Sequence, residues 1–421
     1  TVWVAAADER VKVAVPVSGM SDLESYVTNR VINGHCDCMF AYNLDRWEWT
    51  TILALFAPKP LLFANSDTDP IFPMDGNRRI VARLRTCYDR LGAPALVDEY
   101  VSRGGHDYRP DLRRAVYQFF ETHLKRTDRQ VADEVFAEIP GARLRVFPTD
   151  VDLPKDAINA TADETFVPAA GVKLPIDAAG FPTWKADLLR QLRERCFAAL
   201  PTPVPAARLT FGGEFDVPGT RRDVPTESGI VTSGLVLAVN TQGTRTTLAV
   251  LNPDEDAPAL TRRLLPRMRD GDKLLVGINP RGTGPAAWTR RNPPNTVERS
   301  LALLGDTADA GRVRDAAAVL AGQPAPVRLV GRGPAGVIAA YAALLVPDKA
   351  AEVVILDPPT SHRDGPHFLG VMRVLDIPAA LALLAPGIPL TLAGDRARDR
   401  AFNLTAAAYT MAGAGAKLVR E

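Results

Sequence analysis

Two short stretches decide how this chain folds: Asn65-Ser66-Asp67-Thr68-Asp69-Pro70 and Arg103-Gly104-Gly105-His106-Asp107. Each follows an apolar run typical of a buried strand, at 60–64 and at 96–101. An acid and then a histidine at the ends of successive parallel strands are the second and third members of a Ser-Asp-His triad whose serine comes first in the chain. That serine should lie on a Gly-x-Ser-x-Gly turn, and the 421 residues contain no such turn.

We expect His106 to be the general base of this triad. The two glycines before it let the loop bend sharply and bring the imidazole over the edge of the sheet. Asp69 is the expected orienting carboxylate, which would accept the imidazole N–H and fix its tautomer. Asp67 and Asp75 are alternatives on the same loop, although the rigid Asp-Pro-Ile-Phe-Pro run favours Asp69. The alternative for His106 is a loop histidine that bonds a backbone carbonyl.

The composition is that of an ordinary globular protein, with 46% hydrophobic and 24% charged residues. The net charge of +1 gives no reason to expect nucleic acid or a membrane surface as a partner. Four cysteines make no disulfide framework in a chain of this length. The chain starts at Thr1 with no signal layout, so we expect its N-terminus to reflect truncation or processing. The compartment and oligomeric state stay open, with a secreted or periplasmic location favoured.

The chain divides into three segments. Residues 1–126 show a helix and strand at 1–17, an aromatic-rich insertion at 21–58, and the strands 60–64 and 96–101 alternating with helices. Residues 127–207 are proline-rich and predict a connecting region with one helix at 185–200. Residues 208–421 predict a second, largely parallel α/β domain. Its expected strands lie at 229–240, 246–251, 273–278, 327–330, 352–356 and 389–393.

An internal repeat links the first and last segments. Residues 52–64 resemble residues 381–393, and a small-residue helix, a charged turn and a β-branched strand precede each of them. Two copies of one fold explain this pattern, and chance similarity of Ala/Leu-rich segments is the alternative. In the second copy, Gly331-Arg332-Gly333-Pro334-Ala335-Gly336 follows a strand and opens a helix. Gly333 stands where a nucleophilic serine would, so we expect a degenerate, inactive elbow.

The same glycines, Gly331, Gly333 and Gly336, also fit the G-x-G-x-x-G dinucleotide fingerprint. A dinucleotide site is therefore an alternative, although three strand candidates upstream favour a mid-sheet elbow. His35-Cys36-Asp37-Cys38 offers possible metal ligands, but no second cluster would complete a tetrahedral site. The sequence thus predicts no metal and no cofactor.

Three aromatic residues are candidates for the substrate pocket. Trp47 and Trp49 could form a stacking wall for a sugar or an aromatic group, and the alternative is that they anchor a cap onto the core. Tyr108 lies in the histidine loop and completes the candidate pocket.

Residues 1–124 resemble the C-terminal part of the prolyl-oligopeptidase-type α/β-hydrolases, most closely the bacterial acetyl xylan esterase-like members. The resemblance rests on residues 5–19, the Asp69 loop and residues 104–110. It implies serine esterase or peptidase chemistry carried by Asp69 and His106, and a small acyl ester or acylated carbohydrate as substrate. The implied architecture is two α/β-hydrolase-like domains with mostly parallel sheets, the first incomplete.

In that family a Gly-x-Ser-x-Gly-Gly elbow precedes the segment that matches residues 5–19. The serine and the oxyanion donors would then lie outside this chain, so the 421 residues alone should show no turnover. An esterase is favoured over a peptidase because no propeller-like blade repeats occur. A non-catalytic binding module stays open as a further alternative.

Overall fold

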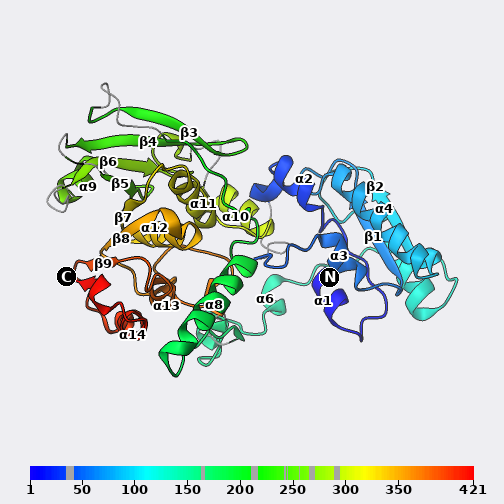
Figure 1. Ribbon diagram of the computed structural model, residues 1–421. Helices are drawn as coiled ribbons and strands as arrows, with labels where there is room; N and C mark the ends of the chain where they lie inside the picture. Colours follow the sequence, from blue (N-terminus) through cyan, green and yellow to red (C-terminus); the bar gives the residue numbers. More distant parts are fainter. Residues whose placement is uncertain are drawn as a thin grey trace. The chain divides into compact units, whose positions relative to one another are not determined.

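The structure is a computed structural model that describes residues 1–34, 42–162, 166–209, 217–240, 243, 245–255, 257–264, 271–288 and 294–421. It holds two compact units (Figure 1). Unit 1 comprises Thr1–Ala162 and Ala302–Gly305, and unit 2 comprises Asp163–Leu301 and Asp306–Glu421. Helices and mostly parallel strands build both units, which confirms the expected α/β class. The division at residues 126 and 207 stays a prediction.

Unit 1 is built on two parallel strands, β1 (Leu61–Ser66) and β2 (Val97–Ser102), with Leu61 opposite Val97. The strand expected at 11–17 is not formed as such. This segment meets β1 only through two isolated parallel bridges, Ala14 to Leu61 and Val17 to Ala64. Pro16 lies between the bridges, and because proline has no N–H it interrupts the ladder.

Helices cover both faces of this small sheet. Successive strand residues point to opposite faces, so Leu61 and Phe63 join the core beneath α1, α3 and α4, while Leu62 and Ala64 pack with α5. The helices of unit 1 are α1 (Val2–Ala7), α2 (Leu23–Thr28), α3 (Trp49–Ala54), α4 (Met74–Arg90), α5 (Pro110–Phe120) and the short α6 (Gly141–Leu144). A π-helical turn, Glu121–Lys125, extends α5.

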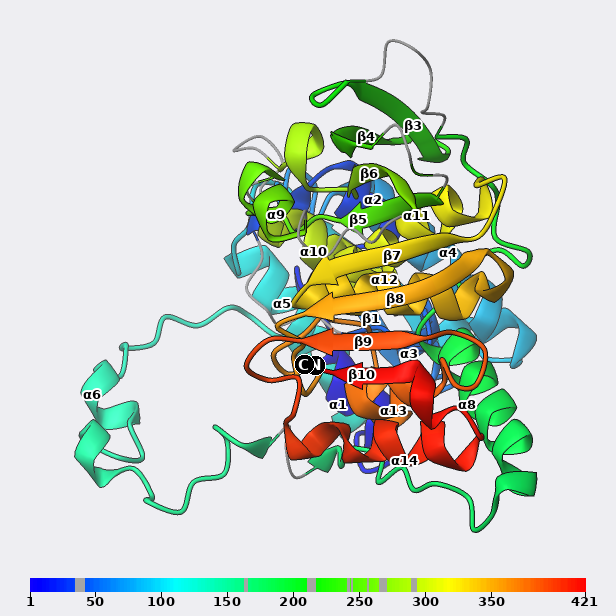
Figure 2. The same cartoon turned by 60° about the vertical axis from the view of Figure 1, so that its left-hand side comes forward.

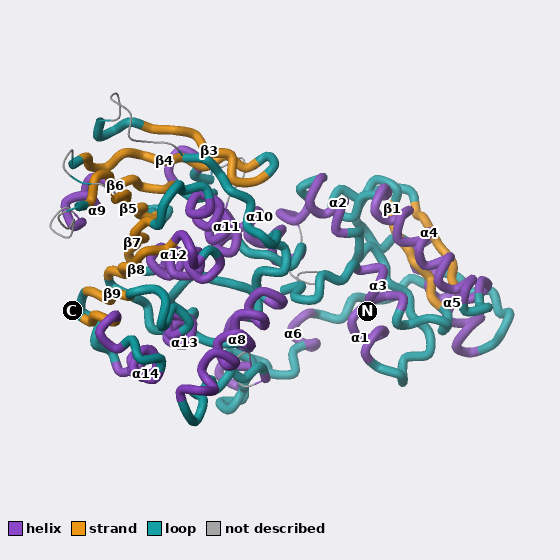
Figure 3. The backbone as a smooth tube through the Cα atoms, in the orientation of Figure 1, coloured by secondary structure: helices purple, strands orange, loops and turns teal. Residues whose placement is uncertain are grey.

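The described residues between 126 and 180 are mostly irregular, drawn as loop in Figure 3. The helix expected at 185–200 is α8 (Phe181–Arg195). It starts earlier than expected because Pro182 fits the first turn of a helix, where no N–H is needed. Phe181, Leu188 and Leu192 of α8 pack into the core of unit 2.

Unit 2 contains an eight-stranded sheet in the order β10-β9-β8-β7-β5-β6-β4-β3 (Figure 2). The strands are β3 (Arg221–Glu227), β4 (Ile230–Val239), β5 (Arg245–Val250), β6 (Asp272–Asn279), β7 (Val327–Arg332), β8 (Ala350–Leu356), β9 (Leu390–Ala393) and β10 (Leu418–Arg420). All pairings are parallel except β3 with β4 and β4 with β6. The edge strands β3 and β10 were not predicted from the sequence.

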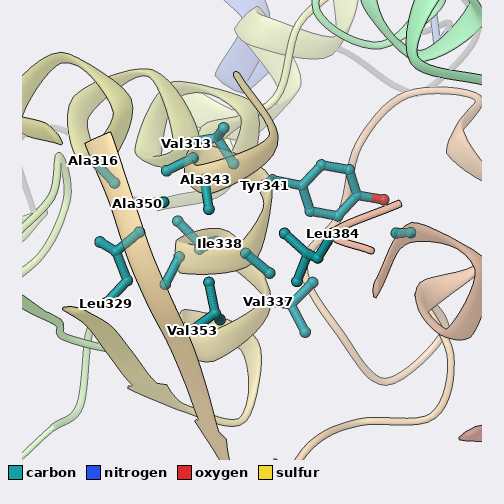
Figure 4. Packing of buried hydrophobic residues seen from close by; sticks show 14 of the residues in the cluster. Val313, Ala316, Leu329, Val337, Ile338, Tyr341, Ala343, Ala350, Val353 and Leu384 are labelled. Carbon is teal, nitrogen blue, oxygen red and sulfur yellow. The ribbon is translucent and has the colours of Figure 1, made fainter. Parts of the chain in front are cut away.

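The main core of unit 2 lies between this sheet and its helices. Figure 4 shows Ile338 of α12 near Leu329 and Val353 of the strands, and Val337 and Tyr341 of the same helix on the side of Leu384. A second cluster on the sheet includes Leu260 and Leu264 of α9. The helices are α9 (Ala257–Leu264), α10 (Pro294–Leu303), α11 (Ala308–Ala321), α12 (Pro334–Leu345), α13 (Ile377–Ala382) and α14 (Asn403–Met411). Among the described helices, none has the length and apolar character needed to cross a bilayer.

The repeat seen in the sequence recurs in the hydrogen bonds of the two units. Ser18 N–H donates to Ala64 O in unit 1 (2.9 Å), and Asp357 N–H donates to Ala393 O in unit 2 (2.7 Å). Ser18 and Asp357 also share a positive φ, of 40° and 49°. Residues 13–17, β1 and β2 of unit 1 therefore correspond to β8, β9 and β10 of unit 2.

A buried tyrosine repeats in the same way. Tyr88 Oη donates to Lys59 O (2.7 Å) in unit 1, and Tyr409 Oη donates to Ile388 O (2.6 Å) in unit 2. Each tyrosine sits near the end of the helix that follows the corresponding strand, on α4 and on α14. The correspondence thus extends from the strands to the helices packed on them.

Candidate functional site

The two decisive loops of the sequence meet at the carboxyl ends of β1 and β2. Asp67 N–H donates to Ser102 O (2.9 Å), and Thr68 N–H donates to Gly104 O (3.1 Å). The Asp67 carboxylate accepts Gly104 N–H at 2.8 Å. Parallel pairing in register places both strand ends at one edge, so these short bonds join the loops directly.

Asp69 and His106 lie in contact at this edge, where His106 Nδ1 is 2.8 Å from Asp69 Oδ2. The other carboxylate oxygen, Oδ1, accepts the backbone N–H groups of Ile71 (3.0 Å) and Phe72 (3.1 Å). The Asp69 side chain is fully buried, whereas the His106 side chain is 47% exposed. A carboxylate that accepts the Nδ1 proton leaves Nε2 unprotonated on the outer side of the ring, which suits a general base.

Phe72 and Arg109 hold the histidine loop from two sides. The Phe72 ring stacks on the imidazole with centroids 5.6 Å apart. Arg109 donates to Ser66 Oγ (2.7 Å) at the end of β1, to Ser102 Oγ (3.0 Å) at the end of β2, and to Gly105 O (2.8 Å). One guanidinium thus bonds both strand ends and the residue directly before His106, a role that the sequence did not reveal.

The alternative acids on the Asp69 loop have other partners. Asp67 binds Gly104 N–H, as described above. Asp75, in the first turn of α4, accepts Ser25 Oγ–H (3.0 Å) and pairs with Arg79 (3.0 Å). Burial acts to raise the pKa of Asp75, but the Arg79 and Ser25 hydrogen bonds prevail and lower it. Among the three acids, the geometry favours Asp69 as the partner of His106.

The predicted pocket aromatics occupy different environments. Trp49 is only 1% exposed and packs edge-on against Trp3, with ring centroids 5.4 Å apart, so its side chain belongs to the core. This placement corrects the expectation that Trp49 contacts substrate. Trp47 and Tyr108 are 48% and 42% exposed and remain accessible. The His35–Cys38 segment lies outside the described residues.

Residues 331–336 of unit 2 form a tight strand–turn–helix elbow between β7 and α12. Gly333 adopts φ 53° and ψ −127° at the turn. A Cβ on Gly331 would lie 2.5 Å from Gly336 N, and a Cβ on Gly336 would lie 2.5 Å from Ile355 Cγ2. The flanking glycines are therefore required by close packing, whereas a Cβ on Gly333 would meet nothing within 4 Å.

The N–H groups around this elbow are engaged or missing. Pro334 has no N–H, and Ala335 N–H donates to Asn252 Oδ1 at 3.1 Å. Gly333 N–H donates to Leu356 O (2.7 Å), and Gly336 N–H donates to Gly333 O (3.1 Å). A pyrophosphate cradle needs unengaged N–H groups at the start of the helix. The elbow therefore argues against the dinucleotide alternative.

Asn252, which sequence reasoning did not single out, joins the elbow to the strand beside it. Its side chain also donates to Arg332 O at 2.9 Å. It follows β5, which pairs with β7. The loop that reaches the elbow is thus the one after β5.

The order of strands in unit 2, with antiparallel β4 near one edge and a strand–turn–helix elbow after the fifth strand, is that of the α/β-hydrolase fold. No family model matches the chain, and no curated protein matches it. Solved structures that are similar in part include three hydrolases. A provisionally assigned acetyl xylan esterase from Bacteroides fragilis is 16% identical, over 59% of this chain and 76% of that chain, with a TM-score of 0.42.

The other two structures are more distant. A glucuronoyl esterase from Sporotrichum thermophile is 10% identical, over 57% of this chain and 86% of its own, with a TM-score of 0.34. The acylaminoacyl peptidase of Pyrococcus horikoshii is 12% identical, over 45% and 34% of the two chains, with a TM-score of 0.29. All three are partial resemblances of fold.

Proposed function

We propose that unit 1 supplies the acid and the base of a serine hydrolase that acts on carboxylic esters. The observation that carries this proposal is the contact between Asp69 Oδ2 and His106 Nδ1, with the carboxylate held from behind by two backbone N–H groups. Such a pair activates a hydroxyl by accepting its proton at Nε2 and stabilising the imidazolium that forms. The exposed outer face of His106 leaves room for the hydroxyl and the ester.

The nucleophile would come from an elbow outside residues 1–421. In unit 2 the elbow strand β7 pairs with β8, and β8 corresponds to residues 13–17 of unit 1. The matching elbow of unit 1 would therefore lie beside residues 13–17. Its serine would attack the ester carbonyl and expel the alcohol, and water activated by His106 would then release the acid from the acyl-enzyme.

The test is ester hydrolysis by the chain extended upstream of Thr1, compared with the 421-residue chain. We expect turnover only in the extended chain, falling on the order of 10³-fold or more in His106→Ala and in Asp69→Asn. Asp67→Asn is the matched control and should stay within a few-fold of the parent. Turnover that is insensitive to His106→Ala, or that the 421-residue chain shows by itself, would overturn the proposal.

The choice between ester and amide substrates belongs to the same experiment. A peptidase of this class would also cleave anilide or peptide substrates at rates comparable with its ester rates. We propose the esterase, so amide turnover by the extended chain should be negligible. Both activities would depend on the same Asp69 and His106.

A further inference from the structure

Unit 2 contains a cavity of about 410 Å³ at its elbow. Its walls come from the loop after β5, the turn between β7 and α12, the start of α11 and the end of β8. The volume falls in the range of small-molecule sites, about 300–1,000 Å³. The glycine at position 333 adds space, because nothing lies within 4 Å of where a side chain would begin.

The chemistry of a hydrolase is missing from this cavity. Gly333 offers no hydroxyl, and Pro334 removes the N–H that follows the nucleophile and would stabilise an oxyanion. The Ala335 N–H is bound to Asn252. No histidine is among the described lining residues. A ligand in this cavity would therefore be bound without being cleaved.

Four of the five charged residues that line the cavity are in ion pairs, and the fifth is the exposed Asp254. Arg312 pairs with Asp309 at 2.6 Å, and Arg332 with Glu255 at 3.2 Å. A third lining group, Asp357, pairs with Arg263 at 3.0 Å. Among the residues that line the cavity, three are aspartates and two are arginines, so no positive charge is in excess. This arrangement disfavours phosphates and carboxylates as ligands.

Paired carboxylates and guanidiniums keep spare hydrogen-bonding capacity. A carboxylate offers about four acceptor positions and a guanidinium five donors, far more than one ion pair uses. The exposed rings of Pro253 and Pro334 add apolar surface to the same cavity. A ring that carries several hydroxyl groups matches both features, since each hydroxyl donates and accepts while the C–H face packs on apolar side chains.

We propose that the elbow cavity of unit 2 is a non-catalytic binding site for a neutral, polyhydroxylated ligand such as a mono- or disaccharide. The elbow with Gly333 in place of a serine, together with the ion-paired residues around it, forms the site. It lies wholly within unit 2, so it stands or falls independently of the role of Asp69 and His106.

The test is titration of the full 421-residue chain with cellobiose, followed by saturation-transfer NMR and calorimetry. Glucuronate and inorganic phosphate serve as anionic comparison probes. We expect saturable binding of cellobiose and weaker or no binding of the anions. Tighter binding of either anion than of cellobiose would overturn the proposal. So would a failure of both cellobiose and glucose, titrated separately, to show saturable binding.

Two variants test whether cellobiose binds in this cavity. Asp357→Asn keeps the shape, and asparagine tolerates the positive φ of this position; it should weaken cellobiose binding about tenfold. Gly333→Asn should abolish binding by filling the open space. The matched control is Asp395→Asn, an exposed aspartate outside the lining, which should bind like the parent. Unchanged binding in folded Asp357→Asn and Gly333→Asn proteins would place the sugar elsewhere and contradict the site.

Discussion

Arg109 and Ser66 lie 43 residues apart in the sequence, and a hydrogen bond of 2.7 Å joins their side chains. Ser66 ends β1, and Arg109 directly precedes α5, so the bond connects the strand before the acid with the helix after the base. The same guanidinium reaches Ser102 and Gly105. The position of His106 thus depends on an arginine that need not touch a substrate.

Replacing Arg109 should loosen the histidine loop while leaving Asp69 in place. In Arg109→Ala, the strand ends and Gly105 O lose a shared donor, and Arg109→Lys restores only part of it because an ammonium lacks the planar fork. We expect the Nδ1–H resonance of His106 to broaden or vanish in the alanine variant. Arg103→Ala, which removes an exposed arginine of the same loop, is the control. A sharp, unshifted resonance in Arg109→Ala would show that Asp69 and Phe72 suffice.

Placing a serine at the elbow of unit 2 should not produce catalysis. Gly333→Ser supplies a hydroxyl, but Pro334 still provides no N–H for the oxyanion, and removal of one such donor costs about 10²–10³ in rate. We expect no release of nitrophenol from p-nitrophenyl acetate above the parent chain. Covalent labelling of Gly333→Ser by a fluorophosphonate would be evidence against this prediction.

Close packing at the elbow predicts an asymmetric response to two glycine substitutions. A Cβ on Gly336 would lie 2.5 Å from Ile355 Cγ2 and 2.7 Å from Gly331 O, so Gly336→Ala should lower the free energy of unfolding by about 1–3 kcal/mol. A Cβ on Gly387 would meet nothing within 4 Å. Gly387→Ala should therefore stay within about 0.5 kcal/mol of the parent. Chemical denaturation of the two variants measures both values, and equal losses would refute the packing argument.

A buried histidine predicts a pH dependence of the stability of unit 2. His362 Nε2 contacts Tyr341 Oη at 2.9 Å, and Nδ1 contacts Pro366 O at 2.8 Å. Burial lowers the pKa of His362 below its ordinary value of 6.5. Below about pH 6.5 the unfolded chain binds a proton at His362 that the folded chain does not bind. The contribution of His362 to the free energy of unfolding is therefore complete above about pH 6.5 and is lost as the pH falls below it.

Melting temperatures at about pH 7.5 and about pH 5.5 measure this effect. The parent should lose more stability on acidification than His362→Gln, whose side chain does not titrate. Identical slopes in the parent and in His362→Gln would remove His362 as the source.

The sequence was most informative where a candidate catalytic residue directly follows a strand. Asp69 and His106 were predicted together because each ends a short apolar run, and parallel strands bring their carboxyl ends to one edge. The six strands expected in the second half all occur with small shifts of their ends. Local patterns suffice for such buried strands, because their alternation and length are encoded in adjacent residues.

Other features depend on contacts that no local pattern encodes. Asn252 binds the Arg332 carbonyl 80 residues further along the chain, so its place at the elbow emerges only from the fold. Residues 11–17 looked like a strand, yet Pro16 limits their pairing to two bridges. The edge strand β3 is largely exposed and contains Pro225, which hides its strand character. Trp49 looked like a pocket residue because burial cannot be inferred from residue type alone.

The matched hydrogen bonds of the two units have a practical consequence. Ser18 is equivalent in position to Asp357, Ala64 to Ala393, and Tyr88 to Tyr409. A substitution in one unit therefore has a defined counterpart in the other. Comparing such paired substitutions separates what the shared scaffold requires from what only the acid–base unit requires. One unit thereby serves as the internal reference for the other, and the comparison shows which residues are needed for the fold and which are needed for catalysis.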